Sequence, residues 1–254
     1  MPLQINSENG EPYLQLPAPH SNIRITPPRM SDVVALTAIL NDPEVYPYLA
    51  TPPYPYLEEH GTAFLRLAKA SCDEGFAEIK QKILAGEEGY VASRCPVQTI
   101  REVQSDGTEV FIGDISFIRH AFPEIQDEEH LQRRAENEEK EKGDSSIVWT
   151  FGSEWTFDSG ELNRSNGLPL PDYLAPSHHR QGIMSTALRE MISQFAIPHL
   201  RARHIVASAF TDNIGSQKIM LKAGFTFVGK VKPNFKLEHK GRTDCSVSMY
   251  EWRW

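Results

Sequence analysis

Residues Leu174–Leu188 read Leu-Ala-Pro-Ser-His-His-Arg-Gln-Gly-Ile-Met-Ser-Thr-Ala-Leu, and this stretch decides the fold. After Gly182 the apolar side chains recur at helical spacing, and Pro198 ends the pattern. The chain is therefore predicted to pass here from a strand through a polar turn into a helix. A helix N-terminus presents unpaired N–H groups and a partial positive charge, so this end, with Arg180 beside it, suits a phosphate group. A single glycine at such a junction is also common in proteins that bind nothing there.

A second stretch makes a binding site the better hypothesis. The apolar segment His204–Phe210 leads into Asn213 and Ser216, and Lys222-Ala-Gly-Phe225 and Gly229 follow. Taken with Tyr173-Leu-Ala-Pro176 and Gly182-Ile-Met184, these motifs stand in the order and at the spacing of the GNAT superfamily of acyl-CoA-dependent N-acyltransferases. The sequence resembles this superfamily, and within it most resembles the branch of the ribosomal-protein N-terminal acetyltransferases. The matching motifs span about a quarter to a third of the chain.

The expected fold class is α/β (α+β), a single domain with a mixed, mostly antiparallel sheet and helices on both faces. Residues 1–21 are expected to be a flexible arm, and residues 22–254 the GNAT-like domain. Two insertions interrupt this domain, a charged one at about 122–145 and a loop at about 153–171. Because the family normally has one strand before the Leu-Ala-Pro segment, 147–152 and 172–175 are predicted to be two parts of that strand.

Several local patterns predict individual elements. Asp106-Gly107 between two strand-like runs predicts a hairpin, and Ser31 is expected to cap a helix that ends near Leu40. Two separate helices are predicted at 57–70 and 76–84. The run 126–144 is charged without an apolar stripe, so it is expected to be a solvated helix or a flexible loop. The Pro- and Tyr-rich segment 45–56 either packs as an ordinary loop or forms a lid over a substrate pocket.

The resemblance implies that acetyl-CoA is the co-substrate and that the backbone from His179 to Met184 holds its diphosphate. Arg180 stands where the family usually has glycine, so we expect an ordinary φ there and a narrower loop. The hydroxyls of Ser185 and Thr186 could add donors. The predicted cofactor-binding residues are Tyr173, Leu174, Ala175, His179, Arg180, Gln181, Gly182, Ile183, Met184, Ser185, Asn213 and Ser216.

The reaction implied is direct attack of a neutral amine on the thioester, with a backbone N–H of residues 173–175 stabilising the oxyanion. The resemblance implies that Asn213 orients the next strand and the pantetheine arm, and a helix N-cap is an equal alternative for it. Many relatives carry a tyrosine as general acid where this chain has Met220, so Ser216 is the substitute by position, with a purely capping role as its alternative. The proton acceptor stays open among Asp114, Asp172 and His178. No Ser-His-Asp or Cys-His arrangement favours covalent catalysis.

Composition narrows the remaining possibilities. A formal charge of −8 argues against nucleic-acid binding and mildly favours cationic amines as substrates. Three widely separated cysteines indicate reduced thiols, and we expect a location in the cytoplasm or also in the nucleus. Residues 1–19 lack the pattern of a signal peptide, and no apolar run is long enough to span a membrane. The pair His178-His179 lacks further ligands, so no metal is expected.

The acceptor stays open between an amine-bearing small molecule, including polyamines, and a protein N-terminus or lysine. Two other functions are alternatives. One is a non-catalytic GNAT-like module that binds CoA or a partner, which Arg180, Met220 and the insertion at 153–171 motivate. The other is a structural α/β protein without an acyl-CoA site. The oligomeric state has no signature in the sequence.

Overall fold

The predicted hairpin supplies two interior strands of the first sheet. The computed structural model describes residues 3–125, 128–152, 172–233 and 237–254. Strands β4 (Thr99–Val103) and β5 (Glu109–Asp114) pair antiparallel around a tight turn, in which Gly107 has a φ of 85°. The Asp106 carboxylate accepts hydrogen bonds from the backbone N–H and the hydroxyl of Thr108, at 2.9 and 2.6 Å. The turn residues therefore form a hairpin as their chemistry predicts.

The first sheet is antiparallel throughout and has the order β1-β2-β3-β4-β5-β8. Its other strands are β1 (Gln4–Ile5), β2 (Pro12–Gln15), β3 (Ile23–Thr26) and β8 (Tyr173–Leu174). The expectation of a flexible arm at residues 1–21 is wrong for its described part. Leu14 and Leu16 are fully buried, and β2 pairs with β3, so apolar burial ties this segment to the sheet.

The second sheet has the order β10-β11-β9-β7-β6. Strand β7 (Val148–Phe151) runs parallel to β9 (His204–Phe210), and the other pairs are antiparallel. The remaining strands are β6 (Phe117–Arg119), β10 (Thr226–Val231) and β11 (Val247–Arg253). Alternate residues of β9 face opposite ways, since Ile205, Ala207 and Ala209 belong to the main core and Val206 and Phe210 to a smaller one.

The two sheets meet where one strand is interrupted. Strand β8 pairs with β5, and β7 pairs with β6, the next strand along the chain. Tyr173 of β8 faces Asp114 of β5, and Phe151 of β7 faces Phe117 of β6, only three residues further along the chain. Strands β7 and β8 therefore follow one another along the continuous segment that contains β5 and β6. The prediction of a single strand in two parts is confirmed by this register. The insertion itself, 153–171, lies outside the described residues.

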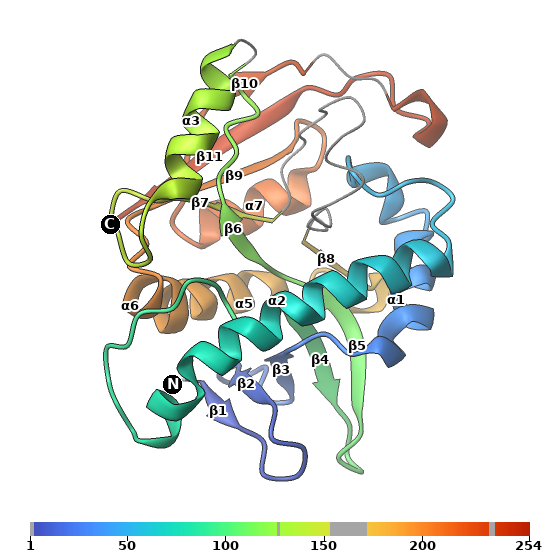
Figure 1. Cartoon of the computed structure of the whole chain (residues 1–254). Helices are drawn as coiled ribbons and strands as arrows, with labels where there is room; N and C mark the ends of the chain where they lie inside the picture. Colours follow the sequence, from blue (N-terminus) through green and yellow to red (C-terminus); the bar gives the residue numbers. More distant parts are fainter. Residues whose placement is uncertain (1–2, 126–127, 153–171, 234–236) are drawn as a thin grey trace.

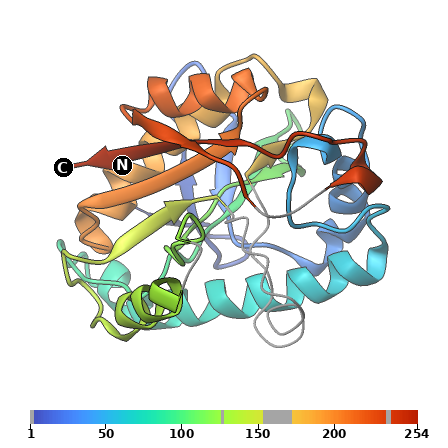
Figure 2. The same cartoon turned by 90° about the horizontal axis from the view of Figure 1, so that it is seen from above.

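Helices cover both sides of the strands. Figure 2 shows α2 (Glu58–Leu84) below them and α7 (Ile214–Lys222) above, and α7 packs against α5 (Ile183–Met191). Helix α1 (Val33–Leu40) packs against α2, and α5 continues through a π-helical turn (Ile192–Ala196) into α6 (Ile197–His199). Short 3-10 turns occupy Met30–Asp32, Tyr46–Tyr48, Pro176–His178 and Glu238–Lys240. None of the described helices is long and apolar enough to cross a membrane.

The segment 57–84 is one helix, so the prediction of two separate helices is wrong. Its buried face continues through the expected break at Cys72, Gly75 and Ile79. A Cβ on Gly75 would lie 2.9 Å from the Arg94 side chain, so the glycine is used for close packing and does not end the helix. Figure 1 shows this long helix running across the molecule.

The charged run contains helix α3 (Glu128–Glu139), one of the two forms predicted for it. Its C-terminal end is held by side chains rather than by an apolar face. Arg119 donates to the carbonyl oxygens of Asn137 and Lys140 at 2.6 and 2.8 Å. The Asn137 amide exchanges hydrogen bonds with the backbone of Val148 at 2.8 and 2.9 Å, which fixes the helix to β7.

The close approach of β5 and β8 requires Gly113. A Cβ at this position would lie 2.2 Å from the Tyr173 carbonyl oxygen, an impossible contact. We predict that Gly113→Ala destabilises the protein by about 1–3 kcal/mol or more, since backbone cannot yield as a side chain does. Urea unfolding would measure the change. The matched control is Gly229→Ala on β10, where nothing lies within 4 Å of the new Cβ. Equal stability of the two variants would contradict the argument.

Candidate functional site

The turn between β8 and α5 presents unpaired backbone donors. The first helical hydrogen bond runs from the Thr186 N–H to the Gly182 carbonyl, at 3.0 Å. The N–H groups of Ile183, Met184 and Ser185 therefore have no partner within the helix. The side chains of these three residues are buried, and no acidic residue lies in the first helical turn. Backbone donors and the positive end of the helix dipole thus face outward together, as a diphosphate would require.

The turn takes a shape that the sequence did not predict. Arg180 has a φ of 61°, so the expectation of an ordinary φ there is wrong. Gly182 is also left-handed, with a φ of 85°. A left-handed residue other than glycine costs about 1–2 kcal/mol, so Arg180 adopts this conformation at some expense in stability. Its guanidinium is exposed, and no described residue pairs with it.

Side chains within the turn hold its shape. The Gln181 amide donates to the Ser177 carbonyl at 2.8 Å, and the His179 ring contacts the Leu174 carbonyl at 2.9 Å. The Ser185 hydroxyl donates to the Gly182 carbonyl at 3.0 Å, so it serves the helix end rather than standing free as a donor. These side chains preorganise the backbone that would contact the phosphates.

Strand β8 turns polar backbone groups away from its partner strand. The Ala175 N–H donates to the Ile112 carbonyl at 2.7 Å. Because bonding alternates along an antiparallel ladder, Leu174 directs its N–H and C=O to the opposite side. The His179 contact to the Leu174 carbonyl agrees with this direction. The Leu174 N–H is thus the group of the predicted set 173–175 that points away from the ladder.

The interruption of the strand brings together two carboxyl groups that each have a buried oxygen. The Asp172 carboxylate accepts from the Ser116 N–H at 3.0 Å, while the Ser116 carbonyl accepts from the Gly152 N–H at 3.1 Å. Asp114 is 2 % exposed and accepts from the Ile115 N–H at 3.1 Å. The second carboxylate oxygens of Asp114 and Asp172 and the Tyr173 hydroxyl are buried and have no hydrogen-bond partner among the described residues. Asp114 and Asp172 are two of the candidate proton acceptors from the sequence, and Tyr173 is one of the predicted cofactor-binding residues. The fold brings the three together.

Burial dominates the titration of this cluster. It raises the pKa of Asp114 to about 8, with a smaller contribution of the same sign from Asp32 and opposing ones from Gln98, the Ile115 N–H and Arg101. Burial also raises the pKa of Asp172 well above its usual range, and the Asp114 charge acts in the same direction. The pKa of Tyr173 is raised for the same two reasons. A carboxyl with a pKa of about 8 can exchange a proton near neutral pH.

The other predicted site residues lie on α7 and in the turn. Asn213 caps α7, since its side-chain oxygen accepts from the Ser216 N–H at 3.1 Å. Ser216 is half-buried in the first turn of α7, and no described residue hydrogen-bonds its hydroxyl. Met220 is buried in the core. His178 contacts Glu102 at 3.4 Å beside the N-terminal hairpin, away from the buried carboxyls.

Sequence reasoning missed two cations that hold the segment 45–56. Lys240 is 4 % exposed and donates to the carbonyl oxygens of Leu49, at 2.7 Å, and of Pro52. Burial lowers its pKa to about 8. Arg242 donates to the Pro47 carbonyl at 3.0 Å and pairs with Asp212 through both nitrogens. The contacts span nearly two hundred residues of sequence, so no local pattern could have indicated them.

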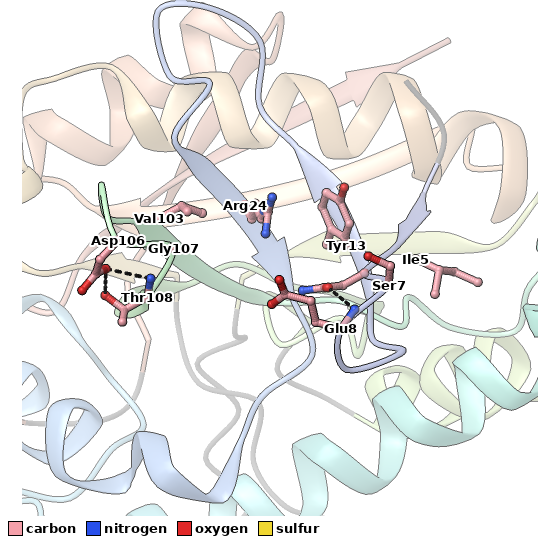
Figure 3. A pocket seen from close by; sticks show the side chains of 10 residues that line it. Ile5, Ser7, Glu8, Tyr13, Arg24, Val103, Asp106, Gly107 and Thr108 are labelled. Atoms are coloured by element: carbon pink, nitrogen blue, oxygen red, sulfur yellow. Dashed lines mark hydrogen bonds between the residues drawn. The ribbon is translucent and has the colours of Figure 1, made fainter.

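A surface hollow of about 500 Å³ lies elsewhere, between the β1–β2 hairpin and the β4–β5 turn (Figure 3). Several of its polar side chains already have partners. Arg24 binds Glu109 at 3.0 Å and lies over the Tyr13 ring, and Asp106 serves its own turn. The hollow contributes nothing to the chemistry above. Within the described residues, no group of His, Cys, Asp or Glu side chains could hold a metal ion.

Comparison with known proteins identifies the family. The model of the acetyltransferase (GNAT) domain matches residues 99–226, which are half of the chain. The chain belongs to the GNAT acetyltransferase family. The match includes the hairpin β4–β5, the interrupted strand, the turn before α5 and the cap of α7. No protein with curated annotation matches the sequence.

Solved GNAT structures share this fold. The ribosomal-protein α-N-acetyltransferase RimL superposes with a TM-score of 0.55 at 14% identity, over 99% of each chain. A GNAT acetyltransferase from Bacillus anthracis gives 0.54 at 12% identity, over 95% of this chain and 98% of its own. The ribosomal-protein-S5-alanine acetyltransferase from Vibrio fischeri gives 0.52 at 12% identity, over 95% and 96%. At these identities the likeness concerns the fold.

Family membership defines the reaction. This GNAT protein is an acyl-CoA-dependent N-acetyltransferase that moves an acetyl group from acetyl-CoA to a primary amine. The expected enzymatic function is confirmed over the non-catalytic alternative. A donor set of free N–H groups, a left-handed glycine and an unpaired arginine fits the phosphates of acetyl-CoA.

Asp114 should make the stability of this GNAT domain fall as pH rises. Its folded pKa, about 8, lies above the value of roughly 3.9 expected in an unfolded chain. Between these values the folded state holds a proton that the unfolded state has released, so stability decreases with pH up to about 8. We predict that Asp114→Asn melts at a higher temperature at pH 8, and that its melting temperature declines less between pH 6 and pH 8.

Calorimetry across that range would measure both changes. The control is Asp106→Asn, because Thr108 lowers the pKa of that exposed carboxyl and keeps it ionised throughout the range. If the melting temperature of Asp114→Asn changes with pH as that of the wild type does, Asp114 does not titrate in that range.

Proposed function

We propose that this enzyme acetylates the α-amino group of a protein N-terminus, with its acyl donor held by the turn before α5. The outward N–H groups of α5, beside the left-handed Arg180 and Gly182, carry the proposal for the donor site. For the acceptor, support comes from the solved structures of similar fold, which include RimL and the ribosomal-protein-S5-alanine acetyltransferase. The net charge of −8 favours a cationic amine over an anionic acceptor.

Each part of the site has a distinct proposed role. Acetyl-CoA supplies the thioester carbonyl that the amine attacks. Leu174 donates its N–H to the oxygen of that carbonyl, where negative charge develops in the transition state. Its orientation away from β5 makes this geometry available. The remaining members of the predicted set contribute backbone to the diphosphate or hold the turn in shape.

The buried carboxyls accept the proton that the amine loses, through water. Asp114 is the proposed base because its pKa of about 8 lies close to neutral pH. Ser216 is the proposed acid for the leaving thiolate, since its hydroxyl has no partner among the described residues. We expect Asp114→Asn to lower kcat by about 100-fold or more and Ser216→Ala to lower it less. Unchanged kcat in either variant would remove that residue from the mechanism.

The donor site is tested by thermal melting with acetyl-CoA. At about 100 times its dissociation constant, a ligand that binds only the folded protein stabilises it by about 2.7 kcal/mol. We predict that acetyl-CoA shifts the melting temperature of the wild type and not that of Gly182→Glu, whose side chain adds a negative charge and a strained left-handed residue. A shift retained in Gly182→Glu would place the acetyl-CoA site elsewhere. The control is Gly229→Glu, in open space on β10.

The acceptor is tested by following CoA release on a matched panel. The panel contains peptides with a free N-terminal alanine or serine, the same peptides with a blocked N-terminus and one internal lysine, and spermidine. We predict turnover with the free N-termini and none with the blocked ones. Turnover restricted to spermidine or to the lysine peptides would overturn the proposed acceptor while leaving the acetyltransferase function intact.

A further inference from the structure

The N-terminal hairpin reaches the turn before α5. Strands β2 and β3 are joined by a short loop. In it the Leu16 N–H donates to the Ile23 carbonyl at 3.0 Å, and the His20 N–H donates to the Pro17 carbonyl at 2.9 Å. The Ile23 N–H in turn donates to the His20 carbonyl at 2.9 Å. His20 therefore stands on an ordered backbone that belongs to the first sheet. These residues precede the part of the chain that the family model matches, which begins at residue 99.

Two contacts join this hairpin to the turn. Glu102 accepts from the Asn22 amide at 3.1 Å and contacts the His178 ring at 3.4 Å, which links the hairpin to the start of the turn. At the other end of the turn, a Cβ on Gly182 would lie 3.6 Å from Nε2 of His20. The imidazole is thus in van der Waals range of the residue that caps α5.

The His20 ring is half-buried, and no described residue forms a hydrogen bond or an ion pair with it. Gly182, which its Nε2 approaches, directly precedes the free N–H groups of α5 and follows the exposed Arg180 by two residues, and the first helical turn holds no carboxylate. An N–H on Nε2 of His20 therefore has no acceptor among the described residues, like the N–H groups at the start of α5. An anion on the helix end would provide that partner.

We propose that His20 donates a hydrogen bond from Nε2 to the diphosphate of CoA, so that the N-terminal hairpin forms one wall of the nucleotide site. This inference rests on the proposed donor site at the turn before α5. It adds a residue from a segment that the sequence motifs do not reach. His20 contributes to the affinity for the nucleotide and takes no part in acetyl transfer.

Calorimetric titration of the full chain with CoA tests the contact without turnover. We expect His20→Ala to raise the Kd for CoA about tenfold, equivalent to 1.4 kcal/mol. His20→Gln, which keeps a side-chain donor, should recover most of this loss. The matched control is His239→Ala, which removes an exposed histidine on the 3-10 turn Glu238–Lys240 and should leave the Kd unchanged. Melting of each variant without ligand checks that it folds.

Two further measurements separate the possible failures. With 3′-dephospho-CoA, the tenfold ratio between wild type and His20→Ala should persist, and its disappearance would overturn the contact with the diphosphate. If Gly182→Glu abolishes CoA binding and His20→Ala leaves it unchanged, the role of His20 is wrong and the donor site stands. If folded wild type does not bind CoA at all, both are wrong.

Discussion

The constraint on which the site depends is an interruption in one strand. Ser116 bonds to the Gly152 N–H on one side and to the Asp172 carboxylate on the other, so a side chain replaces a backbone partner at this point. The ladder resumes in β8 but lasts for two residues, and the chain then leaves it for the turn before α5. Because β8 is the edge strand of its sheet, Leu174 keeps its N–H and C=O directed away from the sheet. A further strand paired with β8 would have consumed these groups.

Buried charge is handled in two opposite ways in this fold. Arg101 and Asp32 are both buried and form a bidentate pair at 2.8 and 2.7 Å, which fixes the start of α1 to β4. Asp114 lies in the same part of the core without such a partner. An unpaired buried carboxyl lowers stability when it ionises, whereas a paired one fixes geometry. The paired Arg101 and Asp32 stabilise the geometry of the fold, whereas an unpaired carboxyl such as Asp114 is what a site for proton transfer requires.

Local chemistry explains what could be predicted from the sequence. The hairpin at Asp106-Gly107, the start of α5 after Gly182 and the order of the GNAT motifs depend on residues close together in the chain, and each was predicted correctly. Helix α2 was predicted as two helices, and its continuity through Gly75 depends on a tertiary contact with the Arg94 side chain that no local pattern indicates. Arginine normally avoids a positive φ, so the left-handed conformation of Arg180 could not be predicted from its residue type, and the surrounding turn overrides that preference. Contacts of His20 and Lys240 depend on tertiary structure and had no local signature.

The proximity of Gly152 and Asp172 also affects how much the length of the chain between them can change. A Cβ on Gly152 would lie 3.0 Å from a carboxylate oxygen of Asp172, so the two ends of the intervening segment are in contact. The sheet therefore fixes where that segment leaves and returns and imposes nothing on its length. Since the entropy of closing a loop grows only slowly with the number of residues, segments of different length can be exchanged there at little energetic cost. Such a junction allows evolution to change the length of the chain between Gly152 and Asp172 while the surrounding strands stay the same.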